Sequence, residues 1–134
     1  MPLDQMNYWA ILVAAAAAFG IGALWYSLLF AKPWTAAIGK SPAELGNPAF
    51  ALVANAFNLI LTAFVFSVIS HWYGEPTSWL TGLWIGFLVW GGFVFTTRFV
   101  GYLFEGQNLP LFLIDAAHFL VIYLVMGAIV GGWG

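Results

Sequence analysis

Four long stretches of the chain are almost free of charged residues, and they constrain the fold more than any other feature of the sequence. A helix that crosses a bilayer needs about 20 mostly apolar residues, and each stretch supplies about that many. Proline, glycine and asparagine separate the stretches, as is typical of turns between helices. We therefore expect an all-α integral membrane protein, a single membrane domain that forms an antiparallel bundle of four transmembrane helices. The predicted spans cover residues 6–31, 48–73, 78–104 and 110–133.

The composition excludes several other classes of protein. Only 6% of the residues are charged, whereas a soluble domain has about 25%, so this chain cannot cover a water-facing surface. Nucleic-acid binding would need clustered Lys and Arg, and the chain has only three such residues. Cysteine is absent, which excludes disulfides, Cys-zinc sites and thiol chemistry. A membrane β-barrel would show alternating polar and apolar residues, but these stretches are apolar on every face.

Aromatic residues and lysines predict the orientation in the membrane. In four antiparallel spans, the aromatic residues at the termini and at the middle turn fall on one side, as in an interfacial belt. Lys32 and Lys40 lie in the loop 32–47, on the opposite side. The positive-inside rule places that loop in the cytoplasm and both termini outside it, so we expect a multi-pass protein of the cell (inner) membrane. The belt residues are Tyr8, Trp9, Trp72, Tyr73, Trp79 and Trp133.

Small residues at four-residue spacing occur in three of the predicted spans. Lipid gives little hydrophobic drive between helices, so such faces matter because they let backbones approach closely. We favour packing inside the monomer over an oligomer interface. The expected partners are membrane lipids, with a second copy or a larger membrane complex as alternatives. The small residues are Ala14, Ala18 and Gly22 in the first span, Gly82 and Gly86 in the third, and Gly127 and Gly131 in the fourth.

Two opposite charges lie at matching distances from the last predicted turn. Arg98 comes about eight residues before the centre of that turn and Asp115 about eight after it. Antiparallel helices place such residues side by side at the same depth. Each charge alone would cost a few kcal/mol inside the membrane, whereas together they can form a charge-assisted pair. We therefore expect Arg98 and Asp115 to be in contact.

Other polar residues reach the same depth, which predicts a polar layer in the cytoplasmic half of the bundle. His118 shares a helix face with Asp115 because three residues separate them. One interpretation is a closed network in which the members satisfy one another. The other is a binding or transport site, in which Arg98 holds an anion and His118 relays protons. The remaining members are Tyr26, Ser27, Asn55 and Asn58, with Thr96 and Thr97 beside them.

The same layer gives little support to metal binding or covalent catalysis. A zinc site needs three or four ligands, and only Asp115, His118 and Glu105 are at hand. Ser27 has no base other than His118, on another helix. We therefore predict no metal site and no catalytic residue, and the sequence indicates no particular cofactor.

Two parts of the chain resemble a known family. One is GALWYSLLFAKPW at residues 22–34. The other is YLFEG at residues 102–106, followed by LFLIDAAH at 111–118 and MGAIVGGW at 126–133. Over nearly the whole chain they resemble a domain-of-unknown-function family of small, mostly bacterial, four-span membrane proteins. The resemblance implies four spans and a cell-membrane location, and it brings no activity. The family more often has Asn where this chain has Asp115.

Three functions remain open at this point. The favoured one is a structural or accessory membrane protein without enzymatic activity. The second is a small transporter or channel for an anion or proton, with Arg98 as the charge site. The third is a membrane enzyme that acts on a lipophilic substrate, with Arg98 at a head group and His118 or Tyr26 moving protons.

Overall fold

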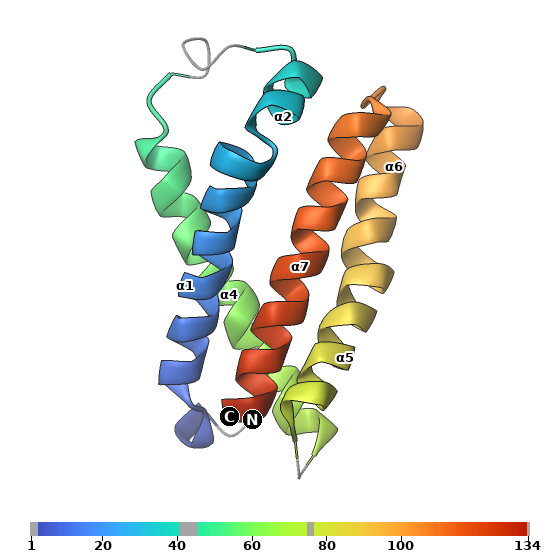
Figure 1. Cartoon of the computed structure of the whole chain (residues 1–134). Coiled ribbons are helices and arrows are strands. Elements are labelled where there is room, and N and C mark those ends of the chain that lie inside the picture. Colours follow the sequence, from blue (N-terminus) through green and yellow to red (C-terminus); the bar gives the residue numbers. More distant parts are fainter. Residues whose placement is uncertain (1–2, 41–45, 75–76, 134) are drawn as a thin grey trace.

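The computed structural model describes residues 3–40, 46–74 and 77–133, and most of them are helical (Figure 1). These residues form four helices, of 22 to 26 residues, that are long and apolar enough to cross a membrane. The prediction of four spans is therefore confirmed, and the chain is an all-α, multi-pass membrane protein. The spans are α1 (Tyr8–Leu24) continued by η2 (Trp25–Leu29), α4 (Ala49–Tyr73), α5 (Trp79–Val89) continued by η3 (Trp90–Phe95) and α6 (Thr96–Phe104), and α7 (Leu109–Trp133).

Short polar residues begin three of these helices. The side chains of Asn7, Ser78 and Asn108 each accept the backbone N–H three residues further on. These bonds satisfy donors in the first turns of α1, α5 and α7 that have no partner within the helix. Gly106, with a φ of 74°, supplies a left-handed turn between α6 and α7. The polar breaks in the sequence thus become caps and turns.

A short helix, α2 (Ala31–Ile38), follows the first span, where the sequence predicted only a loop. Pro33 lies in its first turn, where the missing backbone N–H is tolerated. The first span consequently ends at Leu29, two residues earlier than predicted. Asn108 Nδ2 donates to the carbonyl oxygen of Ala37 at 2.7 Å and ties α2 to the start of α7.

The most extensive helix contact joins α5 to α7, the two lying side by side in Figure 1. A Cβ atom added at Gly82 would overlap the carbonyl group of Gly127. One added at Gly131 would lie 2.6 Å from the carbonyl oxygen of Ser78. The two helices therefore meet backbone to backbone, inside one chain, at positions where only glycine fits. The glycines of this contact are Gly82, Gly86, Gly127 and Gly131.

Helix α4 crosses the bundle diagonally, so that its second half packs against the other helices and its first half diverges from them (Figure 1). We call the half of the bundle with the diverging end of α4 the open half. One face of the second half of α4 is buried in the bundle, and Phe66 on that face is 2% exposed. Its first half leaves the bundle, where Phe50 is 84% and Phe57 69% exposed. The core lies in the half nearest the chain ends and includes Ala14 and Ala18 of α1, which are almost completely buried.

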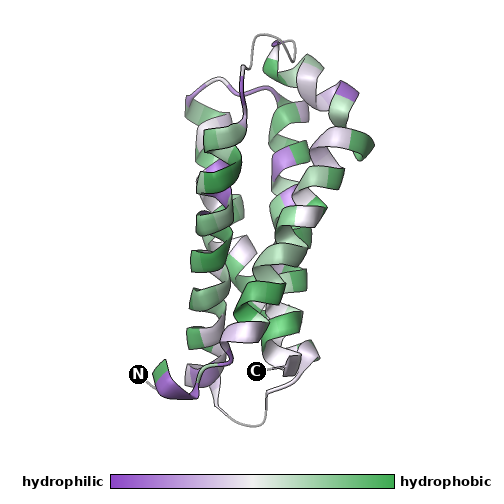
Figure 2. Ribbon diagram, turned by 90° about the vertical axis from the view of Figure 1, so that its left-hand side faces the viewer, coloured by the Kyte–Doolittle hydropathy of each residue, from purple (hydrophilic) through white to green (hydrophobic). Residues whose placement is uncertain are grey.

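The two ends of the described chain lie at the same end of the bundle, as an even number of spans requires (Figure 1). Asn7 Nδ2 donates to the carbonyl oxygen of Trp133 at 3.2 Å, which joins the start of the first span to the end of the last. Within the helices, the hydrophilic residues lie mostly in the opposite half of the bundle (Figure 2). The open half is thus also the more polar half.

Candidate functional site

An ionic contact joins α6 to α7 between the two residues that were predicted to share a depth because they lie equally far from the last turn. Arg98 Nη1 lies 3.8 Å from Asp115 Oδ2, and the Asp115 side chain is 14% exposed. The other carboxylate oxygen, Oδ1, accepts a hydrogen bond from the hydroxyl of Tyr26 at 2.6 Å. The Arg98 guanidinium also lies 5.0 Å from the centre of the Phe119 ring, a favourable cation–π distance. Arg98, whose side chain is 34% exposed, thus joins Asp115 and Tyr26 in a polar network across three helices.

Two tryptophans fix α7 from opposite sides. Trp25 Nε1 donates to the carbonyl oxygen of Ile114 at 3.2 Å, and Trp90 Nε1 donates to that of Ala116 at 2.9 Å. Each tryptophan begins a π-helical turn, η2 or η3. Such turns add a residue to the helical ladder and are frequent at functional sites. The π turns thus lie where the neighbouring helices hold α7.

His118 lies deep in the protein with one nitrogen unused. The residue is 9% exposed, and its Nδ1 has no hydrogen-bond partner among the residues that the structure describes. Aromatic rings surround it, with centroid distances of 4.9 Å to Tyr26 and 6.1 Å to Trp25. On α1, a Cβ at Gly22 would lie 3.2 Å from His118 Nε2. Gly22 therefore contributes to the space in which this ring sits.

A comparison with His71 gives a reason why this nitrogen has no partner among the described residues. His71 Nδ1, in α4, lies 2.9 Å from the carbonyl oxygen of Ser67, four residues earlier in its own helix. For His118, the corresponding carbonyl belongs to Ile114, and it already accepts the indole N–H of Trp25. The hydrogen bond from Trp25 thus occupies the carbonyl oxygen of Ile114, which is the acceptor that corresponds for His118 to the one that His71 uses.

A pocket of about 430 Å³ opens beside His118, within the size range of ligand-binding clefts. It lies between the first span, α2, α4 and α7. Polar side chains come to it from the first span, α4 and α7, and α2 contributes the indole of Trp34. No Asp, Glu, Lys or Arg belongs to its lining in the described part of the chain, so the pocket suits a neutral polar group. The lining residues are Phe19, Gly22, Ala23, Tyr26, Ser27, Trp34, Leu52, Asn55 and His118.

The residues predicted for one polar layer are divided in the structure. Tyr26 belongs both to the polar network and to the pocket, whereas Ser27, Asn55 and His118 belong to the pocket. Asn58 is exposed and does not line this pocket. Thr96 and Thr97 are also exposed, and their hydroxyls donate to the carbonyl oxygens of Gly92 and Phe93 within their own span.

Three tryptophans of the site, Trp25, Trp34 and Trp90, were not predicted from the sequence, nor were the apolar lining residues Phe19, Ala23 and Leu52. The sequence does hold one signal for two of them. Trp25 and Trp90 lie inside predicted spans and not in the interfacial belt, and a buried indole N–H needs an acceptor. Gly22 was predicted as a packing residue, and it also lines the pocket. In the described ranges, no cluster of three or more His, Asp or Glu residues could hold a metal ion.

Comparison with known proteins assigns a family to this architecture. No curated protein and no solved structure matched the chain. The family described as "Protein of unknown function (DUF1761)" matches residues 9–131, which include all the residues of the polar network and of the pocket. The chain therefore belongs to this family of unknown function.

Proposed function

We propose that this protein is a non-enzymatic binding protein of the cell membrane, which holds a neutral polar group in the pocket beside His118. The observation that carries the proposal is the Nδ1 of His118, which has no hydrogen-bond partner among the described residues although the residue is only 9% exposed. An unsatisfied buried polar atom costs about 1–3 kcal/mol. Because Nδ1 is also closed to solvent, the ring has to turn toward the pocket before a ligand there can hydrogen-bond to Nδ1 and recover that free energy.

The remaining lining residues support a group with several hydroxyls. Asn55 offers an amide, Ser27 and Tyr26 offer hydroxyls, and these residue types both donate and accept hydrogen bonds. Arg98 is already paired with Asp115, which favours a structural role for this pair over an anion site. The proposal therefore keeps the accessory role that the sequence favours and adds a ligand to it.

The membrane orientation proposed from Lys32 and Lys40 determines which leaflet the pocket faces. With the α2 side in the cytoplasm and both termini outside, the open half of the bundle and its pocket face the cytoplasmic leaflet. The protein then takes its ligand from that leaflet or from the cytoplasm. The glycines of α5 and α7 are used inside the monomer, so a homo-oligomer stays a prediction that would need a different face.

Ligand-induced stabilisation in detergent tests the proposal. The probe is a medium-chain glycerol monoester, and the control ligand is the methyl ester of the same fatty acid, which lacks the hydroxyls. At 100 times its Kd, the monoester should raise the free energy of unfolding by about 2.7 kcal/mol. The methyl ester should have little effect.

Matched variants show whether the stabilisation comes from this pocket. His118→Phe and Asn55→Leu should abolish it, whereas His71→Phe and Asn58→Leu should keep it. His118→Phe also removes the unsatisfied nitrogen, so we expect the ligand-free variant to unfold no more easily than the unmodified protein. Equal stabilisation of all four variants, or of the unmodified protein by both esters, would refute the proposal.

A further inference from the structure

An apolar groove runs along the first span and ends at the polar pocket. Two further pockets, of about 390 and 330 Å³, lie between α1 and α4 and share Leu12 and Ile60. The second of them shares Phe19 with the polar pocket beside His118. The three pockets therefore follow one another along α1.

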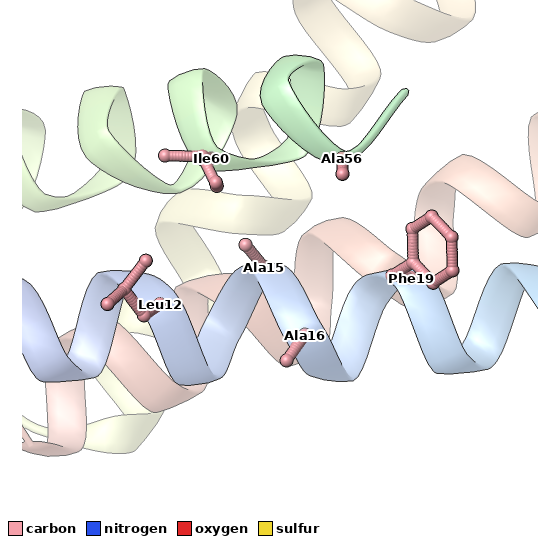
Figure 3. Close-up of a pocket in the computed structure, with 6 residues that line it drawn as sticks. All are labelled: Leu12, Ala15, Ala16, Phe19, Ala56 and Ile60. Carbon is pink, nitrogen blue, oxygen red and sulfur yellow. The ribbon is translucent and has the colours of Figure 1, made fainter. Parts of the chain in front are cut away.

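Small side chains keep the middle of this groove open. Figure 3 shows Ala15 of α1 facing α4, where Ile60 and Ala56 lie opposite. Ala16 lines the same section, and the first half of α4 diverges from the bundle next to it. All six residues that line this section are apolar. The groove therefore suits a hydrocarbon chain and offers no polar partner along its middle section.

The length of the groove matches a lipid tail. Ten residues separate Leu12 from Gly22, which corresponds to about 15 Å along the helix axis. The hydrocarbon core of a bilayer is about 30 Å thick, so the groove is as long as the hydrocarbon of one leaflet. A tail that fills it would place its head group beside His118.

We propose that the groove and the pocket together bind a single-chain neutral glyceride. Its tail lies between α1 and α4, and its glycerol hydroxyls bond to His118, Asn55 and Ser27. This inference rests on the proposed function and names the class of its ligand. A phosphate head group is bound most strongly by Arg or Lys donors, and the described lining of the pocket contains neither. A neutral head group also costs less to bring below the membrane surface than a charged one.

Binding of a long-chain monoglyceride to the full chain in phosphatidylcholine nanodiscs tests this inference. The variant Ala16→Phe partly fills the groove, and because Ala16 is exposed the substitution leaves the core intact. The control is Val13→Phe, at an exposed position on the same helix outside the groove. We expect Ala16→Phe to raise the Kd at least tenfold, and Val13→Phe to leave it within twofold.

The position of the tail provides a second measurement. A monoglyceride with a photoreactive group near the end of its tail should label peptides of both α1 and α4, close to Leu12 and Ile60. His118→Phe should remove this labelling, because the tail is held there by its head group. Labelling that His118→Phe leaves unchanged indicates ordinary surrounding lipid and overturns the inference.

The remaining outcomes separate the two proposals. Stabilisation that requires His118 but ignores Ala16→Phe leaves the polar pocket standing and overturns the tail groove. Failure of any monoglyceride to bind the unmodified protein overturns both. A crosslink between Ala16 residues of two copies shows that a second chain fills the groove, which also overturns the glyceride assignment.

Discussion

The contact between α5 and α7 predicts opposite effects for the same substitution at two glycines. Gly82 faces the backbone of Gly127, and a Cβ atom added there would overlap that carbonyl group. Gly20, on the exposed side of α1, has nothing within 4 Å of the corresponding position. Both glycines lie inside helices, so Gly→Ala gains about 1 kcal/mol of helix propensity at each.

At Gly82, steric overlap makes the expected change in the free energy of unfolding a loss and not a gain. Ordinary contact with a Cβ begins at 3.4 Å, and even at Gly131 the distance to the carbonyl oxygen of Ser78 would be 2.6 Å. The helices would have to separate by about 0.8 Å there and by more at Gly82. Overpacking costs about 1–3 kcal/mol or more, and the loss of close contact along two helices places this case at the upper end. We expect Gly82→Ala to lower the free energy of unfolding by about 2 kcal/mol in total.

Unfolding of the purified protein in mixed detergent micelles measures both changes under the same conditions. Gly20→Ala should raise the free energy of unfolding by up to about 1 kcal/mol, and Gly82→Ala should lower it. If the two variants shift stability in the same direction by similar amounts, α5 and α7 do not meet backbone to backbone, and the reasoning is wrong.

Two further predictions concern the side chains that hold α7. Arg98→Leu should destabilise the protein more than the double variant Arg98→Leu with Asp115→Asn does. The reason is that the single change leaves a carboxylate without its cation. Strictly additive losses in a double-mutant cycle would show that the pair is not coupled. Trp90→Phe should cost about 1 kcal/mol through its lost hydrogen bond. Trp25→Phe should cost less in the same unfolding assay, because it frees the carbonyl four residues before His118 for that histidine, and a larger loss than for Trp90→Phe would contradict this.

The sequence was sufficient for the spans and for the ionic contact. Charge-free stretches fix where helices can cross a membrane, and a turn between two antiparallel helices fixes which residues share a depth. Arg98 and Asp115 could be placed together by counting from that turn alone. The same counting needs no knowledge of how the helices tilt.

The polar layer was predicted less well because its details depend on tertiary geometry. Counting along α4 places Asn55 and Asn58 on one face, but the divergence of that helix leaves only Asn55 at the pocket. The π-helical turns that begin at Trp25 and Trp90 each add a residue to the helical ladder and so shift the register of their helix. The apolar composition of these segments does not indicate where such turns occur. Whether His118 has a free nitrogen depends on a carbonyl that a distant tryptophan occupies.

The most direct test of the central claim is the distance between the free nitrogen and a bound head group. Solid-state NMR on protein with ¹⁵N-labelled histidine, in phosphatidylcholine bilayers with a ¹³C-glycerol monoglyceride, measures it. We predict a through-space contact between the glycerol carbons and His118 Nδ1, and none with His71 Nδ1, which lies against Ser67. No contact at His118, or an equal contact at both histidines, would contradict the account.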